Sequence, residues 1–159
     1  MPPLLIETMH AEIGINAVAD FAAGDVASDI VNMRDYDSVV FLAHWGVGTT
    51  GVVKLTVDAC DDVSASNTAK VPFHYRQLTG GGTSGAVTLA DKDDGVSNTA
   101  GSNQAFLVEV RAQALAASGY NYVRLNVNET TDDPLLGGVL VLMGKPRFAG
   151  TDAVATATT

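Results

Sequence analysis

The chain has 159 residues, one cysteine and a hydrophobic fraction of 47%, which is typical of one globular domain and excludes an internal disulfide. Its 9 Lys and Arg residues against 18 Asp and Glu residues give a formal net charge of -9, which disfavours binding to nucleic acid or anionic lipid. No apolar run approaches the roughly 20 residues of a membrane-spanning helix, so we expect no membrane partner.

Residues 1–24 are predicted to form an N-terminal arm. The arm begins with the apolar stretch MPPLLIE, and no basic residue precedes its leucines as a secretory signal would require. An apolar terminus is usually tied down, either on its own core or on a neighbouring subunit, and the sequence leaves both alternatives open. A short helical turn is also predicted over residues 12–21, although Gly14 weakens it. The candidate contact residues of the arm are Leu4, Leu5, Ile6 and Met9.

Hydrophobic periodicity predicts β-structure along most of residues 25–150. Strict alternation of apolar and polar residues predicts half-buried strands over 51–61, 105–114 and 120–127. A further strand is expected over 71–78, with Pro72 at an edge or at the strand start, and two weaker strands are expected over 25–33 and 86–89.

Two further runs, 38–45 and 138–143, are apolar at nearly every position. Short runs of this kind, rich in β-branched residues and flanked by glycine, are typical of central strands that are buried on both faces. Gly46–Gly51 and Ala116–Gly119 are each predicted to be hairpin connections, and residues 91–103 to be a long polar loop.

These elements predict an all-β fold. We expect a single-domain antiparallel β-sandwich or barrel, jelly-roll-like, with about eight short strands and little helix. The β domain is predicted to cover residues 25–150, and residues 151–159 to form a flexible C-terminal tail.

No catalytic or cofactor pattern is found in the sequence. Residues 46–51, GVGTTG, match a dinucleotide-binding pattern, but the residues that follow alternate like a strand, so no helix is available to hold phosphate. Residues 91–95 fail the EF-hand spacing, which leaves a solvated turn or an irregular calcium site of Asp91, Asp93 and Asp94. The three histidines lack ligand spacing. We therefore expect no enzyme activity, no cofactor, no metal and no catalytic residue.

The order of the segments resembles that of small structural proteins of tailed bacteriophages, in particular head decoration (cement) proteins. The resemblance lies in residues 29–77, which run from DIVNMRDYDSVVF to VPFHYRQ, in GYNYVRLNVNET and in GGVLVLMGKPRFAG. It implies a virion protein that is made in the bacterial cytoplasm and binds the outer surface of the head. It also implies the major capsid protein as partner and a homo-oligomer, with a trimer favoured.

Two alternatives remain at this point. One keeps the phage origin and places the protein in the tail or at the head–tail junction. A carbohydrate-binding sandwich is the alternative of another class, and it would need an exposed aromatic ring such as Tyr75 or Tyr120.

Overall fold

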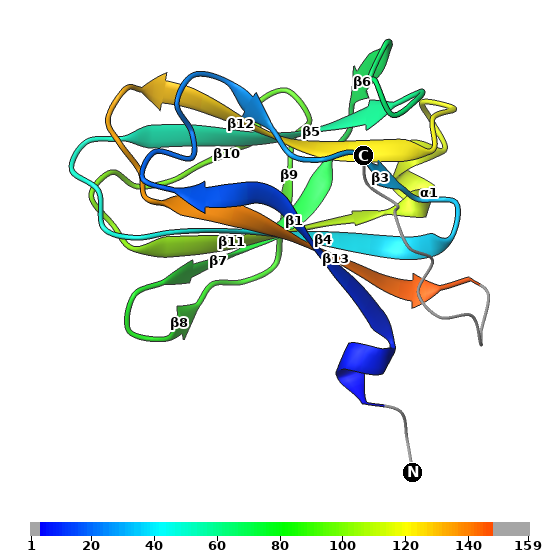
Figure 1. Cartoon of the computed structure of the whole chain (residues 1–159), viewed down its shortest axis with the longest axis horizontal. Helices are drawn as coiled ribbons and strands as arrows, with labels where there is room; N and C mark the ends of the chain where they lie inside the picture. The colour runs from blue at the N-terminus through cyan, green and yellow to red at the C-terminus, as the bar shows by residue number, and fades with distance from the viewer. Residues whose placement is uncertain (1–3, 148–159) are drawn as a thin grey trace.

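The computed structural model describes residues 4–147 and shows two antiparallel sheets packed face to face (Figure 1). The larger sheet, sheet A, has seven strands in the order β1-β13-β4-β11-β7-β8, and β9 also pairs β7. Its strands are β1 (Met9–Val18), β13 (Gly137–Pro146), β4 (Tyr36–Trp45), β11 (Gln104–Arg111), β7 (Phe73–Thr79), β8 (Thr83–Ser84) and β9 (Thr88–Ala90).

Sheet B has six strands, in the order β10-β5-β12-β2, with β3 pairing β12 and β6 pairing β5. Two short helical segments complete the described chain, η1 (Leu5–Glu7) and α1 (Ala112–Leu115). The strands of sheet B are β10 (Val96–Ser97), β5 (Val52–Cys60), β12 (Tyr122–Thr131), β2 (Val26–Ala27), β3 (Val31–Asn32) and β6 (Thr68–Lys70). Both sheets are open in the described residues, so the all-β sandwich is confirmed and the barrel is not formed.

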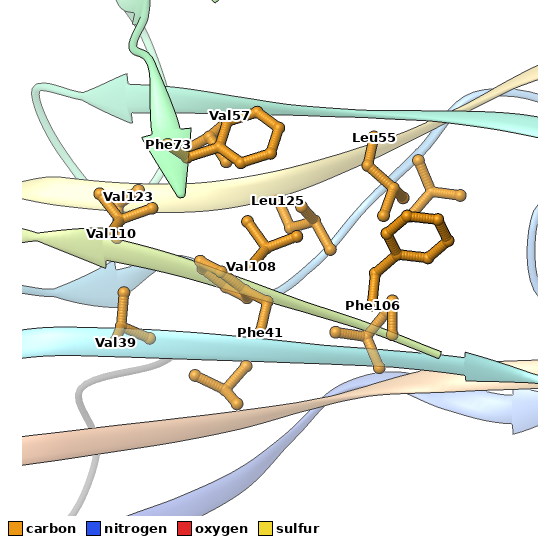
Figure 2. Close-up of a cluster of buried hydrophobic side chains, with 14 of the residues drawn as sticks. Val39, Phe41, Leu55, Val57, Phe73, Phe106, Val108, Val110, Val123 and Leu125 are labelled. Carbon is orange, nitrogen blue, oxygen red and sulfur yellow. The ribbon is translucent and has the colours of Figure 1, made fainter. Parts of the chain in front are cut away.

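The core fills the space between the two sheets. Alternate residues of β4 and β11 point into it from sheet A, and alternate residues of β5 and β12 meet them from sheet B (Figure 2). Phe41, Phe106 and Leu125 are fully buried there, and Trp45 stacks between Phe21 and Phe106 with ring centroids 5.7 and 5.6 Å away. Each fully buried side chain of this size contributes roughly 1.5–3 kcal/mol to the free energy of unfolding.

Two segments that the sequence predicts to be hairpin turns instead carry the chain from one sheet to the other. Residues 46–51 lead from β4 in sheet A to β5 in sheet B, and residues 112–121 lead from β11 in sheet A to β12 in sheet B. The strand predicted over 105–114 ends at Arg111, where α1 begins, and Gly119 follows with a positive φ of 74°. The helical turn and the left-handed residue redirect the chain across the core, so the two hairpin predictions are wrong.

The predicted helical turn over residues 12–21 is also wrong, because most of this stretch belongs to β1. Register shifts beside Gly14 mark a bulge that interrupts the alternation on which the strand signal depends. A Cβ at Gly14 would lie 2.7 Å from Val141 Cγ2, so this close approach of β1 to β13 requires glycine. Residues 9–18 of the predicted arm therefore form the edge of sheet A.

Side-chain hydrogen bonds hold the polar loop of residues 91–103 against β5. The Asn98 side chain accepts from the Val53 N–H at 2.8 Å and donates to the Gly51 carbonyl at 3.2 Å. The Gln104 amide donates to the Thr99 carbonyl at 2.9 Å. No helix within residues 4–147 is long and apolar enough to cross a membrane. The predicted tail, residues 151–159, lies outside the described residues.

Candidate interaction surface

The outer face of sheet A, turned away from the core, is apolar. Within β4 and β13, Val39, Phe41 and Val141 point inward and are fully buried, whereas the residues between them point outward. Leu140 is 46% exposed and its neighbour across the sheet edge, Ile13, is 58% exposed. The prediction that the runs 38–45 and 138–143 are buried on both faces is therefore wrong, because residues 4–147 supply no third layer over sheet A.

Strand register places these outward side chains next to one another. Ile13, Leu140, Leu42 and Leu107 follow one another across β1, β13, β4 and β11 as directly paired residues. Paired residues of antiparallel strands point to the same face and contact each other. A second row, made of Ala11, Leu142 and Val40, runs beside the first. The two rows together form the apolar face, defined as Ala11, Ile13, Val40, Leu42, Leu107, Leu140 and Leu142.

The outer face of sheet B has the opposite character. On β5 and β12, the outward positions pair Asp58 with Arg124 and Thr56 with Asn126. The Arg124 guanidinium contacts the Asp58 carboxylate at 3.2 Å. The inner faces of both sheets are apolar and buried, but an apolar outer face is found on sheet A and not on β5 and β12 of sheet B. Contiguous exposed apolar surface on a soluble protein marks an interaction site.

Two hollows open on the apolar face, and they share Val40 and Leu107. The larger, of about 400 Å³, lies between η1 and the strands β4 and β13, with Leu5, Met9 and Leu142 among its lining. The smaller, of about 280 Å³, lies toward β7. There the surface becomes polar, because His74, Arg76 and Glu109 line it.

The N-terminal arm projects from the end of sheet A that carries the larger hollow (Figure 1). Leu4, Leu5 and Ile6 are 57%, 75% and 77% exposed, so they are displayed and do not pack on the chain's own core. The turn is nevertheless ordered, because the Glu7 carboxylate accepts from the Leu4 N–H at 2.7 Å. Met9 belongs to β1 and is half-buried in the hollow. The structure thus brings two of the four predicted arm residues, Leu5 and Met9, to the hollow on the apolar face, whereas Leu4 and Ile6 are exposed and do not line it. Sequence reasoning missed the apolar face itself.

The acidic turns have structural explanations. The Asp91 carboxylate accepts from the N–H groups of Asp93 and Asp94, and these bonds lower the pKa of Asp91. The Asp133 carboxylate accepts from the Thr49 hydroxyl and the Thr50 N–H, which lowers the pKa of Asp133 and fastens the loop after β4. Across residues 4–147, no group of three His, Cys, Asp or Glu side chains is arranged to hold a metal ion.

Cys60 and the two tyrosines considered for a sugar site are buried or packed against the core. Cys60 is fully buried on β5, and burial raises the pKa of its thiol to about 11. Tyr75 is half-buried and lies against Phe106 at 6.1 Å between ring centroids, and Tyr120 is packed against the core. Neither tyrosine therefore presents a fully exposed ring of the kind that a sugar site needs.

No protein-family profile and no curated protein matches this chain. Among solved structures, it is similar to YomS, a protein derived from the SPBc2 prophage, with 14% identity and a TM-score of 0.45 over 91% of this chain and 100% of that one. It is also similar to a structure of infectious bursal disease virus, strain Gx, with 10% identity and a TM-score of 0.24 over 87% of this chain and 40% of that one.

Proposed function

We propose that this chain is a structural protein of a bacteriophage virion and that it works by protein–protein contact. The observation that carries the proposal is the apolar face of sheet A, with the exposed leucines of η1 beside it. The order of its strand segments resembles that of phage head decoration proteins, which supports the same assignment.

Within this proposal, the apolar face and the arm bind the outer surface of the head, and their partner is the major capsid protein. The apolar rows supply the buried centre of the contact, and the polar residues near β7 lie at its rim, as in other specific interfaces. The turn η1 lies beyond the end of sheet A (Figure 1), and in this proposal its exposed residues Leu5 and Ile6 contact a second capsid subunit. This arrangement would stabilise contacts between capsid subunits.

The test is co-sedimentation with empty heads assembled from the major capsid protein of the same genome. We expect saturable binding by the wild-type protein and binding at least tenfold weaker for Leu140→Lys, because a charge would be desolvated in the contact. The matched control is Asn126→Lys on the outer face of sheet B, which should bind as the wild type does. Leu5→Ser separates the contribution of the arm from that of the sheet.

Three outcomes would count against the decoration role. Binding by Leu140→Lys at wild-type strength would remove the apolar face from the contact. Rings or tubes of the protein, without binding to heads, would favour the tail or head–tail junction. Binding to neither heads nor tail parts would contradict a virion role.

A further inference from the structure

One edge of sheet A has no partner strand within residues 4–147. β1 pairs with β13 on one side and forms the edge of the sheet on the other. Among the described residues, the edge is covered beyond Ile13, where the Asp29 N–H donates to the Gly14 carbonyl at 3.0 Å. A regular stretch of strand, Met9–Ile13, is therefore open to pairing.

The backbone groups on this open edge follow from the register. The Gly46 N–H donates to the Leu136 carbonyl at 2.9 Å, so the alternate residues of β13 that include Leu140 and Leu142 bond to β4. The residues between them, Val141 and Met143, face β1 and pair there with Glu12 and His10.

His10 and Glu12 thus direct their backbone groups toward β13. Met9, Ala11 and Ile13 direct theirs toward the open edge, because successive residues of a strand alternate in direction. The edge accordingly offers three regularly spaced donor and acceptor pairs to another strand.

We propose that this edge pairs with the same edge of a second copy, antiparallel and about a two-fold axis at Ala11. In this register Ala11 lies opposite Ala11 of the second copy, and Met9 lies opposite Ile13. His10 lies opposite Glu12 of the second copy, and Glu12 lies opposite His10. An interface about a two-fold axis repeats each contact twice, so both His10–Glu12 contacts form together.

The complementary side chains of His10 and Glu12 select this register over its neighbours. Within one chain His10 Nε2 already contacts Glu12 Oε1 at 2.7 Å, and both side chains are largely buried on the inner side of the sheet. Moving the axis to residue 12 would place Glu12 opposite Glu12, and moving it to residue 10 would place His10 opposite His10. Like charges directly opposite each other destabilise a strand pair, and opposite charges stabilise it.

The pairing also continues the apolar face. Ile13 points to the outer side of sheet A, as its partner Leu140 does, and Met9 lies on the same side because it is four residues away on the same strand. Across the two-fold axis these side chains would meet their counterparts, and one apolar surface would extend over both copies. The partner that fits this edge is therefore another copy of this chain, in a pair rather than the trimer that the resemblance favours.

The first test combines mass and cross-linking. Light scattering after gel filtration should give twice the 16.4 kDa of the single chain. The variant Ala11→Cys should form a disulfide with itself under mild oxidation, because Cα atoms across a bonded antiparallel pair lie about 5.5 Å apart. The matched control is Ala17→Cys, which is exposed on the same strand. In the proposed register it does not lie opposite Ala17 of the second copy, so it should not form a disulfide with itself. The native Cys60 is buried and should not react.

The second test separates loss of pairing from loss of folding. Ala11→Pro removes an N–H that faces the open edge and leaves the bonds to β13 intact, so the far-ultraviolet circular dichroism should be unchanged. We expect its self-association to be at least tenfold weaker. His10→Glu should also dissociate the pair, and the double variant His10→Glu with Glu12→Lys should restore it, because opposite charges again face each other.

A monomer at every concentration would overturn the proposal, and so would a trimer. A pair in which Ala11→Cys fails to cross-link would overturn the register and with it the assigned edge. None of these measurements involves phage heads, so their failure and the failure of the proposed function are distinguishable.

Discussion

Phe106 is the residue on which the core depends most visibly. Its ring is fully buried between the sheets and contacts both Trp45 and Tyr75. Removing it would leave a cavity that β-strands on both sides are too constrained to fill.

We therefore expect Phe106→Ala to lower the free energy of unfolding by about 3–5 kcal/mol, as measured by urea denaturation. The control is Val47→Ala, since Val47 is exposed in the loop after β4. Equal stability of the two variants would contradict the packing of the core.

The buried thiol of Cys60 gives the stability a dependence on high pH. Burial raises the pKa of this thiol to about 11, above that of a thiol in the unfolded chain. Between the unfolded and the folded pKa, the unfolded chain loses the proton while the folded protein keeps it, so stability falls as the pH rises. The effect is absent at neutral pH, where both states are protonated.

We expect the free energy of unfolding to fall more steeply between pH 9 and pH 11 for the wild type than for Cys60→Ala. Chemical denaturation at a series of pH values measures this difference directly. Parallel profiles for the two proteins would show that the thiol is not protected by the fold.

At the level of elements, β13 shows how one strand serves two purposes. Val141 points into the core and Leu140 points to the apolar face, although the two are adjacent in the sequence. Because successive side chains of a strand point to opposite faces, a substitution on the inner face changes the stability of the fold, and one on the outer face changes the apolar face alone.

We expect Val141→Ala to lower the free energy of unfolding by roughly 1–3 kcal/mol and Leu140→Ala to change it by less than about 0.5 kcal/mol. Thermal unfolding of the two variants side by side is the measurement. A larger loss for Leu140→Ala would mean that the apolar face stabilises the single chain rather than a contact.

Much of the fold follows from the sequence, and the exceptions have physical reasons. The strands over 38–45, 51–61, 71–78, 120–127 and 138–143 are confirmed as β4, β5, β7, β12 and β13. Alternation is a local property, so it identifies a strand but does not tell which sheet the strand joins. This is why the sequence predicts hairpins at Gly46–Gly51 and Ala116–Gly119, where the chain instead passes from sheet A to sheet B.

The candidate surface could be predicted only in part. The arm leucines stand out because they are apolar and precede the first strand. The apolar outward residues of β4 and β13 look the same in sequence as residues of a fully buried strand. Only the structure shows that one side of Leu42 and Leu140 is left uncovered.

At the scale of the whole molecule, the two outer faces differ in character, because that of sheet A is apolar and that of sheet B is polar. The polar residues Asp58, Arg124 and Asn126 lie on the outer face of β5 and β12, where Asp58 is only 7% exposed and is paired with Arg124. The formal net charge of -9 favours solubility. The proposed decoration role needs this asymmetry, because one side would bind the head and the other would face water.

The open edge of β1 has a consequence for how strongly such a protein holds its target. In the proposed pair, two copies joined at this edge would carry their apolar faces on the same side of one continuous sheet, so a pair would meet the head twice. Once the first face is bound, the second is held at a high effective concentration, and the gain in avidity can reach 10²–10⁴ without any new contact. We expect Ala11→Pro to weaken binding to heads within that range although it leaves the apolar face untouched, and equal binding of single and paired forms would refute this. Individually weak contacts would then suffice to keep the protein on the particle.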